Sequence, residues 1–77
     1  MKFPKATTIK IAIEQGKTGL FYGTSNDLKG LLIAEQTEEA VREKAPEIIA
    51  KMYHAAGVCS VDILTVGPST FVARPAP

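Results

Sequence analysis

The sequence contains little of the chemistry from which most enzymes and metal sites are built. Its 77 residues include one cysteine, one histidine and no tryptophan. A single cysteine excludes an internal disulfide bond, and one cysteine with one histidine supplies too few ligands for a structural zinc site. We therefore expect no metal and no cofactor. Aromatic residues make up only 6% of the chain, so the core must be mostly aliphatic.

Excess charge of one sign and long apolar runs are also missing. Nine basic and eight acidic residues leave a formal net charge of +1, without the basic stripe that is typical of nucleic-acid binders. The longest apolar run, residues 31–34, is far shorter than the ~20 residues that span a bilayer, and no signal-peptide pattern follows Met1. We expect a cytoplasmic protein without a membrane segment. Residues 1–77 are enough for a single domain.

The strongest strand signal lies in residues 8–14. Apolar and polar side chains alternate there, and three β-branched residues form one face: Ile9, Ile11 and Ile13. Gly16 and Gly19 then supply the positive φ angles of a hairpin turn. We expect residues 20–25 to return as a second, antiparallel strand.

Two further strands have weaker patterns. A turn-rich stretch at residues 26–30 leads to a short strand over residues 31–35. This strand has two alternative inward faces: Leu31 with Ile33, or Leu32 with Ala34. Alternation over residues 60–66 predicts a fourth strand, and residues 67–69 end it. Residues 70–74 are either a short extra strand or a loose arm.

A helix is predicted between the third and fourth strands. Thr37 is placed as an N-cap, with two glutamates after it at the positive end of the helix dipole. An apolar stripe at helical spacing follows, up to a C-terminal stop at Gly57. Its members are Val41, Ala45, Ile48, Met52 and Ala56, widened by Ile49 and Tyr53. Glu47 and Lys51 are spaced for an ion pair, and Pro46 predicts a kink because it removes one backbone hydrogen bond.

The element order β-β-β-α-β predicts an α+β fold with one four-stranded mixed sheet. The first three strands form an antiparallel meander, and the helix returns the chain so that residues 60–66 pair in parallel with residues 8–14. The sheet order is then 3-2-1-4, with one helix packed on one face, as in a partial ribonuclease-H-like fold. The core spans about residues 8–66, and residues 67–77 form a tail. The sheet face without a helix is a candidate partner surface.

Residues 20–31 read Leu-Phe-Tyr-Gly-Thr-Ser-Asn-Asp-Leu-Lys-Gly-Leu, an aromatic strand followed by an Asn-Asp-Leu-Lys-Gly turn. A short strand and the threonine-capped acidic helix start at residues 35–39 come next. Over about residues 8–66 this arrangement resembles the HicB-like antitoxins. Pro46 and the two isoleucines after it match a variant branch with a proline in the helix. Lys29 departs from the family at a position where proline is usual, and Leu31 at one where many members have cysteine.

The resemblance implies a HicB-like domain that acts as a type II antitoxin. Such a domain binds and blocks a small HicA-like ribonuclease toxin, often as a homodimer. Typical members continue into a DNA-binding segment, for which residues 67–77 are too few, so we expect none here. We expect the partner contacts in the second strand and the loop after it: Tyr22, Ser25, Asn26, Asp27, Leu28 and Lys29.

Catalytic interpretations find little support in the residue pattern. A ribonuclease-H-like nuclease needs carboxylates that converge on metal ions at the first strand, whose inward positions are isoleucines. We place His54 in solvent and Cys59 as a half-buried small residue without a nearby base. Gly16-Lys17-Thr18 lacks the upstream glycine of a phosphate-binding loop. We expect no catalytic residues and no enzyme activity.

Two alternatives to an antitoxin remain open. One is an orphan self-associating structural module of a mobile element. The other is nucleic-acid binding through the open sheet face, where Phe21 or Tyr22 would stack on bases.

Overall fold

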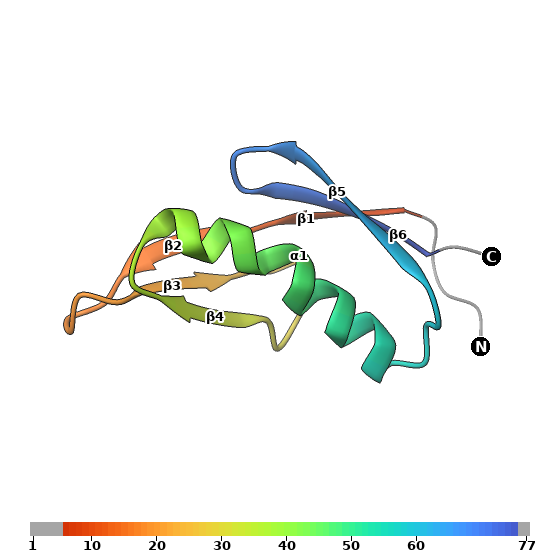
Figure 1. Ribbon diagram of the computed structural model, residues 1–77, viewed down its shortest axis with the longest axis horizontal. Coiled ribbons are helices and arrows are strands. Elements are labelled where there is room, and N and C mark those ends of the chain that lie inside the picture. The colour runs from red at the N-terminus through yellow and green to blue at the C-terminus, as the bar shows by residue number, and fades with distance from the viewer. Residues whose placement is uncertain (1–5, 76–77) are drawn as a thin grey trace.

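The computed structural model describes residues 6–75, which form six strands and one helix (Figure 1). In chain order the elements are β1 (Thr7–Lys10), β2 (Ala12–Gln15), β3 (Phe21–Thr24), β4 (Leu32–Glu35), α1 (Glu38–Ala55), β5 (Val61–Gly67) and β6 (Thr70–Pro75). The strands form two three-stranded sheets, ordered β1-β6-β5 and β2-β3-β4, in which every pair is antiparallel. Ile11 is the only residue between β1 and β2, so one bent stretch of chain belongs to both sheets.

The predicted single four-stranded mixed sheet of order 3-2-1-4 is therefore wrong, and with it the partial ribonuclease-H-like and HicB-like strand arrangement. Residues 61–67 form a strand, but this strand, β5, pairs with β6 and not with the first strand. β6 lies between β5 and β1 and is antiparallel to both. The sequence pattern over residues 60–66 located the strand correctly, whereas the parallel pairing assigned to it does not occur.

The cause of this error is the segment assigned to the tail. Residues 70–75 form β6, in which Phe71 is 2% exposed and Ala73 is 0% exposed. A turn at residues 68–69 folds this segment back on β5. A hairpin is closed by a short loop and costs less chain entropy than a long crossover, so β6 occupies the edge of β1 that was assigned to residues 60–66. The remaining parts of the predicted lead-in and tail, residues 1–5 and 76–77, lie outside the described residues.

Helix α1 follows the sequence pattern closely. The hydroxyl of Thr37 accepts a hydrogen bond from the N–H of Ala40 at 3.0 Å, which confirms the N-cap. Lys51 and Glu47 form the expected ion pair at 3.2 Å. Pro46 lies inside one continuous helix, whose axis changes direction in its middle part (Figure 1). The buried row is slightly rotated from the predicted stripe and consists of Val41, Ala45, Ile49 and Tyr53, while Ala56 is exposed.

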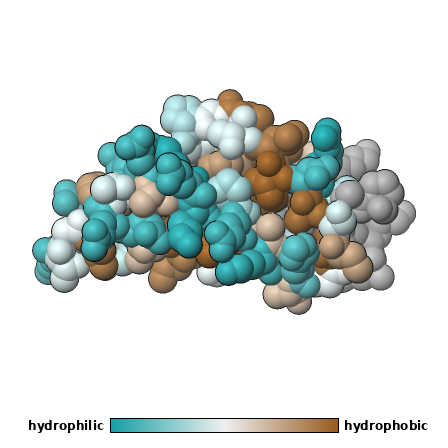
Figure 2. Space-filling model, in the orientation of Figure 1, coloured by the Kyte–Doolittle hydropathy of each residue, from teal (hydrophilic) through white to brown (hydrophobic). Residues whose placement is uncertain are grey.

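The core lies between α1 and one face of both sheets. The largest fully buried side chains are Phe71, Ile9, Ile49 and Val41, which come from β6, β1 and both halves of the helix. Ile11 is buried and Ile13 half-buried, so the predicted isoleucine face is confirmed. Leu31 and Ile33 are also buried, which settles the inward face of the third strand. Figure 2 shows this side of the molecule, with hydrophilic residues over the outer surface of α1 and hydrophobic ones beside it along β5.

The helix approaches β3 most closely at Gly23. A Cβ atom at this position would lie 2.7 Å from Cγ1 of Val41 and 3.2 Å from Cγ2 of Ile11. Both neighbours are buried, so neither can move away freely, and any side chain here would push the helix off the sheet. The absence of a side chain at Gly23 thus sets the distance between the two layers.

None of the described residues belongs to a helix long and apolar enough to cross a membrane.

We predict that Gly23→Ala lowers the free energy of unfolding by about 1–3 kcal/mol, because the added methyl group overpacks the core. Gly67→Ala is the matched control, since a Cβ there meets Thr70 only at ordinary contact distances of 3.4–3.5 Å. Urea unfolding followed by circular dichroism measures both variants. Equal stability of the two variants would contradict the close approach at Gly23.

We predict that Phe71→Ala costs about 3–5 kcal/mol, because a large and fully buried side chain is lost from β6. Val72→Ala, one residue along on the opposite face, should cost much less because Val72 is only half-buried. The same unfolding measurement decides between them. If residues 70–75 were a loose arm, both substitutions would leave the unfolding midpoint unchanged.

Candidate partner-binding surface

The sheet face opposite α1 is the first candidate surface. Because the isoleucines of the first strand point toward the helix, the residues between them point the other way. Strand register places Ala12, Thr24 and Leu32 in one row across β2, β3 and β4. Leu32 is 62% exposed, the highest value among the large hydrophobic side chains noted as exposed. The helix lies on one side of the strands only (Figure 1), so this row faces solvent.

A second row crosses the other sheet on the same face. Register aligns Thr8, Val72 and Leu64 across β1, β6 and β5, and Leu64 is 42% exposed. Asp62 and Arg74, on neighbouring strands of the hairpin, are partners in the next position of the register. The open face therefore combines two apolar rows with charges of both signs, a composition that suits protein contacts better than a polyanion.

A hollow of about 380 Å³ lies where the two sheets meet. It is lined by Lys10, Ile11, Ala12, Thr24, Ser25, Asn26 and Asp27. The chain bends here, and the carboxylate of Asp27 accepts a hydrogen bond from the N–H of Lys10 at 2.9 Å. The hydroxyl of Ser25 accepts one from the N–H of Asp27 at 3.1 Å. These two bonds hold the loop after β3 against the junction of the sheets and place its polar groups beside the row that contains Leu32.

The six residues predicted for partner binding do not form one cluster. Ser25, Asn26 and Asp27 line the hollow together. Tyr22 lies on the same face but further along β3, where its ring covers Gly16 so closely that a Cβ there would overlap it.

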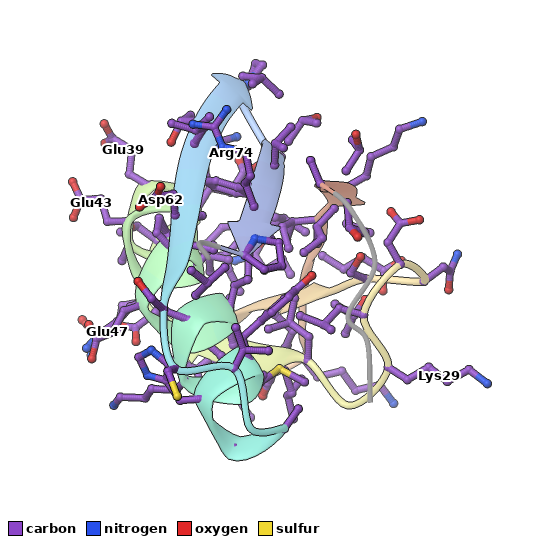
Figure 3. The ribbon with its side chains drawn as sticks, turned by 90° about the vertical axis from the view of Figure 1, so that its right-hand side faces the viewer. Lys29, Glu39, Glu43, Glu47, Asp62 and Arg74 are labelled. Atoms are coloured by element: carbon purple, nitrogen blue, oxygen red, sulfur yellow. The ribbon has the colours of Figure 1, made fainter. Side chains whose placement is uncertain are left out.

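The other two predicted residues are placed differently. Leu28 packs against the hydrophobic core, so its side chain stabilises the fold. The side chain of Lys29 extends away from the body of the molecule (Figure 3).

Sequence reasoning missed several residues of this surface. The alternation of the first strand directed Lys10 and Ala12 away from the isoleucine face, as observed, but they were not predicted as partner contacts. Leu32 was left undecided because a four-residue strand gives too short a pattern to choose a face. Leu64 was assigned to a strand with the correct alternation, but its exposure depends on the absence of a helix over that side.

The isolated histidine and cysteine meet at another hollow, of about 370 Å³, at the end of α1. Its lining consists of His54, Gly57, Val58 and Cys59. Cys59 is exposed, so the prediction that it is half-buried is wrong: within residues 56–60 only Val58 packs into the core, and the other four residues are exposed. His54 is exposed as predicted, and no hydrogen bond joins the two side chains in the described structure. Within residues 6–75 no three side chains of the types His, Cys, Asp and Glu are grouped to hold a metal ion.

We predict that Asp27→Ala frees the N–H of Lys10 and accelerates its hydrogen exchange several-fold, because a hydrogen bond worth about 1 kcal/mol is lost. Asp27→Asn keeps an acceptor oxygen and should show a smaller change. Amide exchange measured by NMR checks this residue by residue. An unchanged rate at Lys10 in Asp27→Ala would show that the carboxylate does not hold the bend.

The function of this surface has to be argued from its geometry. No model of a known protein family matches the chain, and neither does any curated protein or any solved structure. The resemblance of residues 20–31 to the HicB-like antitoxins thus gains no support and meets no objection from known relatives.

Proposed function

We propose that this chain is a non-enzymatic protein-binding module that uses the open face of its two sheets. The observation that carries the proposal is Leu32, 62% exposed beside Ala12 and Thr24 on a face that the helix leaves uncovered. An apolar side chain that is exposed on an uncovered sheet face loses unfavourable contact with water when a partner covers it. The neighbouring hollow supplies polar anchors, the side chains of Asn26 and Asp27, that would orient the partner.

The partner class that we propose is a small HicA-like ribonuclease toxin, which the chain would bind and block. This rests on the resemblance of residues 20–31 and 35–39, which lie in β3, β4, the loop between them and the start of α1. Residues 24–27 of the first segment line the hollow. The resemblance extends over about residues 8–66, and the pairing of β5 with β6 departs from the strand order that it implies.

Self-association is the second candidate function, and it has an observation of its own. β4 is an edge strand, with β3 on one side only, and it carries the exposed Leu32. A second copy could add to this edge and cover both leucines in a symmetric homodimer. Nucleic-acid binding has less support from the structure. Glu14 and Asp62 lie on the open face together with Lys10 and Arg74, so this face is not uniformly basic.

We predict that Leu32→Lys abolishes partner binding while the chain stays folded, because the charge would be buried in the interface without a counterion. Ala55→Lys adds the same charge at an exposed site on α1 and should bind like the wild type. The wild-type chain, immobilised, should retain a small basic protein from a lysate of its native cells. Addition of free chain should then suppress RNA cleavage by the eluted protein.

Three results would contradict the antitoxin proposal. They are a retained protein that cleaves no RNA, a failure of the chain to inhibit that cleavage, and equal retention of the protein by Leu32→Lys. A wild-type dimer in analytical ultracentrifugation that becomes monomeric in Leu32→Lys, with no retained protein, would favour self-association instead.

A further inference from the structure

A second surface lies at the free edge of β5. β6 pairs with one side of β5, and no strand within residues 6–75 pairs with the other side. The N–H of Ile11 donates to the carbonyl of Ser69 at 2.8 Å, which fixes which residues of β6 bond to the first strand. In an antiparallel sheet, successive residues of a middle strand direct their backbone hydrogen bonds to opposite neighbours. The residues of β6 that do not bond to the first strand therefore bond to Asp62 and Leu64 of β5. The N–H and C=O groups of Val61, Ile63 and Thr65 then point outward.

This edge has few of the features that usually prevent pairing with another strand, and its one irregularity, a bulge, lies between Thr65 and Gly67 near the end of the strand. β5 is seven residues long, contains no lysine and no proline, and carries a single charge, Asp62. Leu64 and Val66 are 42% and 59% exposed. The other outer strands, β1, β2 and β4, have only four residues each, and β4 ends at Glu35. A long apolar edge with free backbone groups is the kind of strand that accepts an extended peptide.

A groove of about 620 Å³ runs beside this edge, between α1 and the β5–β6 turn. Its lining includes Pro46 and Phe71 as apolar parts and Glu39 and Glu43 as acidic parts. Figure 3 shows both glutamates projecting from the helix on the side of β5 that is away from β6. Neither forms an ion pair within the described residues.

Nearby charges are already engaged. Arg42 also lines the groove, but its guanidinium donates to the carboxylate of Glu38 at 3.3 Å and to the hydroxyl of Ser69 at 3.2 Å. Glu47 continues the acidic row but is paired with Lys51 at 3.2 Å and Lys44 at 3.9 Å. Glu39 and Glu43 are therefore the acidic groups that remain free to meet a cationic ligand.

The spacing of these two glutamates fits an extended chain. Four residues along a helix advance roughly 6 Å, and two residues along a strand advance about 6.7 Å. α1 lies beside β5 and packs against it (Figure 1). Alternate side chains of a strand added to β5 would point toward the helix side and meet Glu39 and Glu43 in turn.

We propose that β5 accepts, as an added strand, an extended segment of a partner protein that carries lysine or arginine at every second position. Main-chain hydrogen bonds to Ile63 and Thr65 supply the pairing, and the two glutamates select the basic side chains. A second copy of this chain is a poor occupant, because β5 has no basic residue and two-fold pairing would bring two pairs of free glutamates together. This inference does not rest on the toxin-binding proposal, because it uses a different surface.

The test uses the whole chain and a peptide of the length of β5 in which lysine and valine alternate. We expect the largest NMR shift changes at the amides of β5 and at Glu39 and Glu43. Glu39→Gln with Glu43→Gln should weaken binding about five- to tenfold and reduce its dependence on salt. Glu14→Gln with Glu35→Gln, which removes the same charge elsewhere, should leave the affinity unchanged. A peptide with the same residues but consecutive lysines should bind more weakly.

Thr65→Pro removes one outward N–H and should also weaken the peptide, with folding checked by circular dichroism. If Thr65→Pro does not fold, the comparison of the two double glutamine variants tests the proposal. The proposal is overturned if the peptide shifts amides of β2, β3 and β4 instead, if both glutamine pairs weaken binding equally, or if no binding is seen at low salt. Concentration-dependent broadening of the β5 amides without peptide would identify a second copy as the occupant and would also overturn it. Leu32→Lys should bind the peptide normally. Peptide binding at β5 is therefore tested independently of partner binding at the open face.

Discussion

A single helix has to cover one face of two sheets, and the packing of its buried row sets the rest of the structure. Val41 and Ile49 are fully buried together with Ile9 of β1 and Phe71 of β6, so the two halves of α1 and the first sheet share one core. The helix also packs on β4 and β3 of the second sheet, and at Gly23 the missing side chain permits its close approach to β3. With one helix available, the opposite face of every strand is left to solvent. The uncovered rows that contain Leu32 and Leu64 follow directly from this limit.

The bend at Ile11 explains why polar groups gather at one point of the open face. β1 and β2 pair with different neighbours, β6 and β3, and a single residue separates them. At this junction the N–H of Lys10 has no partner in the strand ladder of the described residues and points toward the loop after β3. Asp27 supplies the acceptor for Lys10, which draws the loop after β3 into place. The same bond that satisfies the backbone thus positions Ser25 and Asn26 at the rim of the hollow.

The two surfaces proposed for binding differ in their physical basis. On the open face side chains would supply the contact, because the main-chain groups of β3 are already paired on both sides. At β5 the main chain itself is available, and the side chains of Glu39 and Glu43 add a preference for positive charge. A partner could occupy one without covering the other, since β5 presents its edge and the Leu32 row belongs to the other sheet.

Local patterns in the sequence were sufficient for most elements. The alternation of isoleucines and the N-cap at Thr37 depend on neighbours within a few residues, and both are found in the structure. The apolar stripe of the helix is found in a slightly rotated form, with Ala56 exposed. Pairing between distant segments was not determined in this way. Residues 60–66 read equally well as a strand beside β1 or as the outer half of a hairpin, and the choice depends on whether Phe71 finds a buried place. Only the folded molecule decides that, because the hole filled by Phe71 is built by the helix and β1 together, from residues far apart in the chain.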